Sequence, residues 1–259
     1  MKNYGFKLDT PSEKDYVFGS FLPYEELQPN GDWTPFLPKA EYQNTNDFEP
    51  YCCVTETILN CVEILIKQQY GEEVNYSDRF LASISGTKNG GNTPRTVADF
   101  LRILGVVPED VYPFKADTFD EFYQPIPEEL KTLAKEFVDN WEFKYESVPT
   151  NMIETALKSS PLGVSVYAWV DKDGVFYNPN QQDNHFTTLY KIDDHQHFFD
   201  SYANDGSPLK LGDKNMAHSS IQRYYVKKRI KPIETNWITD LFTRLSDFII
   251  DICNLFWPK

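Results

Sequence analysis

Residues 53–70 carry the strongest helical signal in the chain and limit what it can fold into. Apolar side chains recur there at intervals of three or four residues, and Gly71 follows where a helix would end. The apolar positions are Val54, Ile58, Cys61, Val62, Leu65 and Ile66. Such a helix must bury its apolar face against a partner, so we expect the core to be built around it.

The helical period continues through the first half of the sequence and gives way to strand patterns in the second. Further helices are predicted at 76–84, 94–105, 127–140 and 150–158. β-branched, aromatic or alternating segments predict strands at 163–170, 185–193, 197–203 and 222–230. Helices followed by strands indicate an α+β fold of two lobes, an N-terminal helical lobe and a C-terminal antiparallel β lobe.

The charge balance and the cysteine pattern exclude several classes of function. With 25 basic and 39 acidic residues the net charge is −14, which disfavours binding to nucleic acid. The chain has no apolar run long enough to span a membrane and no signal peptide, so a cytoplasmic or virion-associated location is expected. Four cysteines without disulfide or zinc-site spacing predict free thiols, no metal and no cofactor.

Two adjacent cysteines precede the helical period. Cys53 stands at the predicted N-terminus of the helix, where unpaired backbone N–H groups and the helix dipole favour a thiolate. We therefore expect Cys53 to be a nucleophile. Cys52 is the competitor for that role: it would have to point back into the region before the helix, and a shift of one residue would exchange the two cysteines. A buried, unreactive Cys53 is the remaining alternative.

A histidine and an aspartate follow at distances that suit a thiol protease. His185 and Asp200 lie 132 and 147 residues after Cys53 (185 − 53 = 132 and 200 − 53 = 147), within the interval of about 130–150 residues found in one group of these enzymes. His185 would act as base and proton donor, and Asp200 would orient it. An aspartate holds an imidazolium more firmly than an asparagine, which moves the pH range of activity upward.

Five stretches, in the same order, resemble papain-like cysteine proteases (peptidase family C1). NGGNTPRTVADFLRILGVVPEDVYPF at 89–114 is similar to the family's paired glycines, helix and Tyr-Pro-aromatic end, and ALKSSPLGVSVYAW at 156–169 to the segment that enters the β lobe. NHFTTLYKID resembles the strand that carries the family's histidine, DSY at 200–202 its Asn-Ser-Trp motif, and DW at 32–33 the start of its mature domain. The resemblance covers roughly residues 30–230.

The resemblance implies an oxyanion donor and a substrate-binding loop. Gln43 would join the backbone N–H of the nucleophile as oxyanion donor if the residues between them form a bulge, and Asn46 fits the family's interval without one. Gly90 and Gly91 would let a substrate backbone run antiparallel along the cleft, because glycine permits close approach.

The sequence also differs from the family's motifs at several positions, and two aromatic residues stand near the expected substrate pocket. Phe186 would reshape or narrow the second specificity pocket, and Tyr202 stands where the family has a shielding tryptophan. The sequence has Pro-Tyr-Cys-Cys-Val for Cys-Gly-Ser-Cys-Trp, Asp200 for the triad asparagine, and neither the family's disulfides nor a pro-segment of family length. An intracellular or virus-encoded relative would show such departures, and the run around Cys53 is similar to papain-like proteins of bacteriophages.

The chain is expected to divide into an N-terminal arm at 1–30, a peptidase domain at 31–233 and an amphipathic helix at 234–259. The apolar stripe of that helix, within 235–257, would dock on the domain itself or on a protein partner. The resemblance implies a cysteine endopeptidase that hydrolyses a peptide or protein substrate through a thioester. A non-catalytic papain-fold structural or interaction protein, such as a virion component, is the alternative, and acyl transfer to an amine is a third.

Overall fold

The computed structural model describes residues 2–13, 15–43, 47–202 and 207–230. Residues 1–228 form one unit, and residues 229–259 are grouped apart from it. The amphipathic helix expected at 234–259 lies outside the described residues. Among the described residues, no helix is long and apolar enough to cross a membrane.

The long apolar helix forms as the period predicts. α1 runs from Cys53 to Tyr70 and ends at Gly71, whose φ of 67° lies in the left-handed region that favours glycine. The other α-helices are α2 (Asp78–Ile84), α3 (Pro94–Leu104), α4 (Phe119–Phe122), α5 (Glu128–Asn140) and α6 (Ile153–Leu157). Short 3₁₀ turns include η1 (Thr34–Phe36) and η3 (Thr150–Met152).

The bounds of α2 and α3 follow from their caps. Ser77 accepts a hydrogen bond from the backbone N–H of Phe80, so α2 starts after it rather than at residue 76 as predicted. Thr93 caps α3 in the same way, with Pro94 in the first turn, where its missing N–H costs nothing.

The described strands form one eight-stranded sheet in the order β1-β8-β2-β5-β6-β7-β4-β3. Neighbours pair antiparallel except β4 and β7, which are parallel. The strands are β1 (Trp141–Ser147), β2 (Leu162–Val166), β3 (Asp171–Lys172), β4 (Val175–Phe176), β5 (His185–Ile192), β6 (His195–Phe199), β7 (Leu209–Asp213) and β8 (Ile221–Lys228). The α+β class is therefore confirmed, while β1, β3, β4 and β7 were not predicted.

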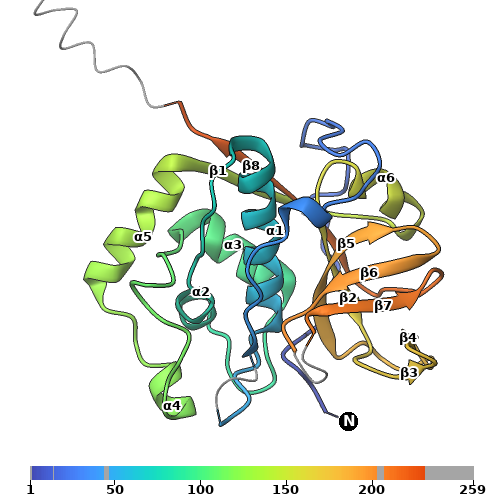
Figure 1. The fold of residues 1–259 in the computed structure, drawn as a ribbon. Helices are drawn as coiled ribbons and strands as arrows, with labels where there is room; N and C mark the ends of the chain where they lie inside the picture. The colour runs from blue at the N-terminus through green and yellow to red at the C-terminus, as the bar shows by residue number, and fades with distance from the viewer. Residues whose placement is uncertain (1, 14, 44–46, 203–206, 231–259) are drawn as a thin grey trace, which may run out of the picture. The chain divides into compact units, whose positions relative to one another are not determined.

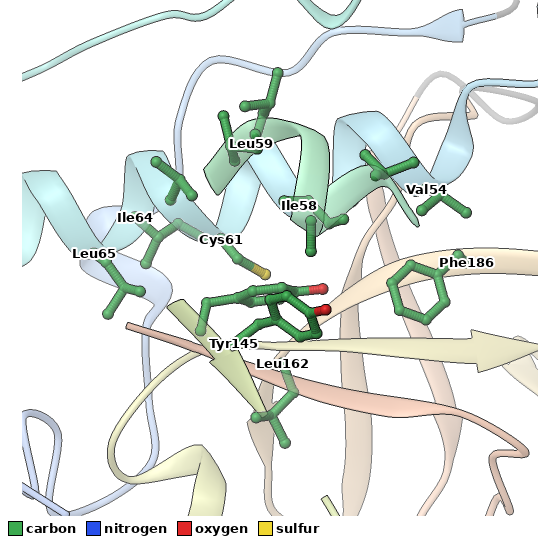
Figure 2. Packing of buried hydrophobic residues seen from close by; sticks show 14 of the residues in the cluster. Val54, Ile58, Leu59, Cys61, Ile64, Leu65, Tyr145, Leu162 and Phe186 are labelled. Carbon is green, nitrogen blue, oxygen red and sulfur yellow. The ribbon is translucent and has the colours of Figure 1, made fainter. Parts of the chain in front are cut away.

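α1 packs along the sheet and joins the two halves of the unit. The helices α2 to α5 lie on one side of α1 and the strands β2 to β7 on the other (Figure 1). Figure 2 shows Ile58, Cys61 and Leu65 of α1 facing Tyr145 of β1 and Phe186 of β5. Full burial of each large aliphatic side chain stabilises the fold by roughly 1.5–3 kcal/mol, so α1 holds the start of β5 close to its own first turn.

The N-terminal arm is tied to the sheet through a buried carboxylate. Glu146 of β1 accepts hydrogen bonds from the backbone N–H groups of Phe21 and Leu22 and pairs with Arg223 of β8 at 2.7 Å. Val17 forms an isolated bridge with Ser147. The arm is therefore anchored at residues 17–22, and the residues before this anchor extend to the candidate site.

Candidate active site

The two cysteines at the start of α1 face different surroundings. Cys53 is the first residue of α1 and lies in the main core, whereas Cys52 precedes the helix and packs against Ala82 and Phe122. The Cys52 sulfur lies 3.7 Å from Gln43 Oε1 and 3.7 Å from a carboxylate oxygen of α1. Both side chains are fully buried. Cys52 therefore faces the helices, and Cys53 faces the sheet.

Burial is the main influence on the pKa of both thiols. Loss of solvation raises the pKa of Cys52 and of Cys53 well above the usual range, and the nearby Glu56 carboxyl acts in the same direction. For Cys53, a backbone hydrogen bond from Phe186 acts in the opposite direction and lowers the pKa. The sulfur of Cys53 thus lies beside the residue that directly follows His185.

His185 and Asp200 form a buried pair at adjoining strand ends. His185 begins β5, Asp200 follows β6, and these strands pair with each other. His185 Nε2 lies 2.5 Å from Asp200 Oδ1, and both side chains are excluded from solvent. His185 Nδ1 is buried and has no hydrogen-bond partner among the described residues. That nitrogen therefore keeps an unused donor or acceptor position.

Three aromatic rings surround the imidazole of His185 edge-on. The ring of Tyr4 lies 5.5 Å away, that of Tyr202 5.6 Å and that of Trp169 5.9 Å, measured between centroids. The indole N–H of Trp169 also donates to Asp200 Oδ2 at 3.0 Å. Neither Tyr4 nor Trp169 was among the predicted site residues, although Trp169 ends the stretch at 156–169 that resembles the segment entering the family's β lobe.

Gln43 is fully buried and donates from Nε2 to the backbone carbonyl of Tyr4 at 3.2 Å. The Glu49 carboxylate lies 3.4 Å from the same Nε2 and accepts the backbone N–H of Tyr51 and the hydroxyl of Tyr202. An amide held in this way can donate to a carbonyl oxygen at the site. Asn46, the alternative donor, lies outside the described residues.

Residues 2–7, which we term the covering segment, lie across the site. The Tyr4 N–H donates to the carbonyl of Asn184, the residue before His185, at 3.0 Å, and Asn184 Nδ2 donates to the Lys2 carbonyl at 2.9 Å. On the other side, the Gly5 carbonyl accepts the Asn92 N–H at 3.0 Å. These contacts of residues 2–7 were not predicted from the sequence.

The covering segment also fills the positions predicted to receive substrate. The Phe6 ring stacks on Phe186 at 5.7 Å with the planes 6° apart, and both rings are buried. Asn3 Nδ2 donates to the Gly90 carbonyl at 3.3 Å. Gly91, with φ of 83°, touches the backbone of the segment. The segment pairs with Asn92 in the parallel sense, opposite to the antiparallel course expected of a substrate.

The described residues offer no obvious metal site. No group of three or more histidine, cysteine, aspartate or glutamate side chains in the described part of the chain is placed to hold a metal ion.

Comparison with known proteins supports the fold. No family model and no curated protein match the chain. Among solved structures, it is similar to xylellain, a cysteine protease from Xylella fastidiosa, with 19% identity, a TM-score of 0.62, and coverage of 88% of this chain and 97% of that one. It is also similar to digestive procathepsin L 3 of the Tenebrio molitor larval midgut, with 14% identity, a TM-score of 0.57, and coverage of 82% and 75%. The chain has a papain-like fold.

Proposed function

We propose that this protein is a cysteine peptidase that is latent while residues 2–7 cover its active site. The observation that carries the proposal is the buried His185–Asp200 pair. His185 Nδ1 has no hydrogen-bond partner among the described residues, and the next residue, Phe186, forms a backbone hydrogen bond with Cys53. A nucleophile at a helix N-terminus, a base and an orienting carboxylate are the parts of a thiol protease. The papain-like fold of known cysteine proteases agrees with it.

In the proposed reaction, Cys53 loses its proton to His185 and its sulfur attacks the carbonyl carbon of a peptide bond. The C–N bond then breaks, His185 returns the proton to the leaving amine, and an acyl thioester remains on Cys53. Water, deprotonated by His185, cleaves that thioester and restores the thiol. Gln43 Nε2 and the backbone N–H of Cys53 would donate to the oxyanion in both steps. Asp200 would hold the imidazole in the required orientation.

The covering segment would keep the enzyme latent. The Tyr4 carbonyl occupies the hydrogen bond that Gln43 would give to a substrate oxygen, and Phe6 occupies the surface of Phe186. The segment crosses the site in the sense opposite to the expected substrate, which would direct its peptide bonds away from cleavage. Since the arm is anchored at residues 17–22, the covering segment could leave without loss of that anchor.

A non-catalytic papain-fold protein is the second candidate. The full burial of both thiols and the occupied site favour it. It predicts that displacement of the covering segment leaves Cys53 as unreactive as Cys61, which is buried beside Thr188 in the core.

Labelling with a peptidyl epoxide tests the two candidates. Full-length protein that carries Gly5→Ala to displace the covering segment should be labelled at a single cysteine, located by mass spectrometry. Cys53→Ala should abolish the label and Cys52→Ala should retain it. Label that persists in Cys53→Ala and is lost in Cys52→Ala would move the nucleophile to Cys52. Equally slow reaction of all thiols would support the non-catalytic candidate.

A further inference from the structure

Asp200 is a buried carboxylate with an N–H donor on each oxygen. Its side chain has no exposed surface, Oδ1 lies 2.5 Å from His185 Nε2, and Oδ2 accepts the indole N–H of Trp169 at 3.0 Å. A carboxylate removed from water is costly unless such hydrogen bonds replace the lost solvent. The Trp169 bond is therefore part of what makes a charged Asp200 tolerable at this position.

The ring of Trp169 covers the same pair. It meets the His185 ring edge-on, with 75° between the planes, and packs at 4.9 Å against Phe176 and 5.6 Å against Phe198. Trp169 follows the end of β2 and precedes Asp200 by 31 residues. The Trp169 side chain thus both donates a hydrogen bond to the Asp200 carboxylate and covers the His185 imidazole.

Tyr202 stands where the resemblance places a shielding tryptophan, but its polar group has another partner. The Tyr202 hydroxyl donates to Glu49, which also lies beside Gln43. Tyr202 therefore belongs to the network around the amide, and its ring contributes only an edge contact with His185.

We infer that Trp169 is the positioning residue of the His185–Asp200 pair. Its N–H fixes the rotation of the carboxylate so that Oδ1 stays aligned with His185 Nε2, and its ring keeps water from the bond. This inference rests on the proposed function for its catalytic meaning, but the hydrogen bond itself can be tested without activity.

The titratable groups around Asp200 explain why a neutral donor suits this place. Burial, and to a smaller extent the nearby Asp200 carboxylate, raise the pKa of the Cys53 thiol, the Glu56 carboxyl and the Tyr4 hydroxyl. The Lys210 ammonium lies 5.9 Å from the centre of the Trp169 ring. An indole N–H stabilises the carboxylate without an added formal charge, so the carboxylate keeps its attraction for an imidazolium.

Proton NMR of the full-length protein with ¹⁵N-labelled histidine tests the bond directly. The Nε2-bound proton of His185 should give a downfield signal protected from exchange with water, assigned by its loss in His185→Gln. Trp169→Phe keeps an aromatic ring and removes the N–H, and it should shift this signal and speed its exchange. Trp141→Phe, the same change at a distant tryptophan of β1, is the matched control and should leave the signal unchanged. An unchanged signal in Trp169→Phe would overturn the inference.

A double-mutant cycle gives the second readout. In the Gly5→Ala background, Trp169→Phe should slow alkylation of Cys53 by iodoacetamide by about 2- to 10-fold, the value of one neutral hydrogen bond. The same substitution should cost nothing further once Asp200 is alanine, because Trp169 acts through that carboxylate. An equal loss in both backgrounds contradicts the inference. If no variant is alkylated but the NMR signal responds, the proposed function fails while the role of Trp169 in the pair stands.

Discussion

Gly5 of the covering segment and Gly91 are in direct backbone contact. A Cβ atom added to Gly91 would lie 1.8 Å from the Gly5 carbonyl oxygen, and one added to Gly5 would lie 2.2 Å from the carbonyl oxygen of Tyr51. Both glycines have positive φ, 117° for Gly5 and 83° for Gly91. Neither position can accept a side chain while the covering segment remains in place.

Gly5→Ala is therefore expected to displace the covering segment. The added Cβ would clash with the backbone of Tyr51, and the positive φ of residue 5 adds about 1–2 kcal/mol of strain. The rate of Cys53 labelling should therefore rise at least tenfold, which corresponds to about 1.4 kcal/mol. The control is Gly19→Ala, which has φ of 83° but no atom within 4 Å of the added Cβ. Labelling rates of the two variants and wild type measure the effect, and equal rates would contradict latency.

Asp200→Asn is expected to change the pH profile of peptide hydrolysis. The amide can still accept the N–H of His185, but it lacks the negative charge that stabilises an imidazolium 2.5 Å away. The alkaline limb of the profile should therefore move to lower pH by about one unit or more. Rates from pH 5 to 10 for both proteins, in the Gly5→Ala background, provide the measurement. A lower rate with an unmoved limb would mean that Asp200 acts by shape alone.

Gln43→Ala should lower kcat by about 10²- to 10³-fold with little change in KM, because an oxyanion donor acts mainly in the transition state. Gln68→Ala is the matched control, since its amide donates to the Leu27 carbonyl away from the site. Steady-state kinetics in the Gly5→Ala background separate the two constants. A rise in KM alone would assign Gln43 to substrate binding.

Glu146→Ala is expected to lower the free energy of unfolding by about 3–5 kcal/mol, because Arg223 would remain buried without its counter-charge. The N–H groups of Phe21 and Leu22 would lose their acceptor as well. Glu128→Ala removes an exposed ion pair with Lys131 and should cost less than about 1 kcal/mol. Urea unfolding of the three proteins compares them, and equal losses would refute the anchoring role.

Glu109 should make the protein less stable as the pH rises. Burial raises the pKa of Glu109 from 4.5 to about 7, so the folded state holds a proton that the unfolded state has released. Its stabilising contribution is complete below pH 4.5 and is lost as the pH rises through 7. Glu109→Gln keeps the acceptor for the Phe114 N–H and removes this loss, about 1–2 kcal/mol after allowance for solvent screening.

Unfolding free energies at pH 5 and pH 8 test this prediction. The difference between the two pH values should be smaller in Glu109→Gln than in wild type. Glu128→Gln changes an exposed carboxyl in the same way and serves as control. An unchanged difference in Glu109→Gln would mean that Glu109 is ionised in the folded protein at both pH values.

The sequence predicted what local period and motif determine. The bounds of α1 followed from the apolar spacing between Cys53 and Gly71, and the proximity of His185 and Asp200 followed from motif order. The short strands β3 and β4 have two residues each, too few for a period to register. β3 forms by pairing with its neighbour β4, and β4 pairs in turn with the more distant β7.

The contacts of Tyr4 and Trp169 were beyond sequence reasoning for a different reason. Tyr4 reaches His185 from the N-terminal arm and Trp169 from the residues after β2, and neither the resemblance nor the residue spacing tells which way their rings turn. The residue roles of Cys53, His185, Asp200 and Gln43 remain predictions, which the variants above test.

The hydrogen bond from Asn184 to the Lys2 carbonyl has a practical consequence for anyone who prepares this protein. A tag fused ahead of Lys2 would be attached close to the candidate site, and it would disturb the hydrogen bonds that hold residues 2–7 there. Samples with N-terminal and C-terminal tags should therefore differ in thiol reactivity even when their folds are the same. Purification strategy is thus an experimental variable for this chain.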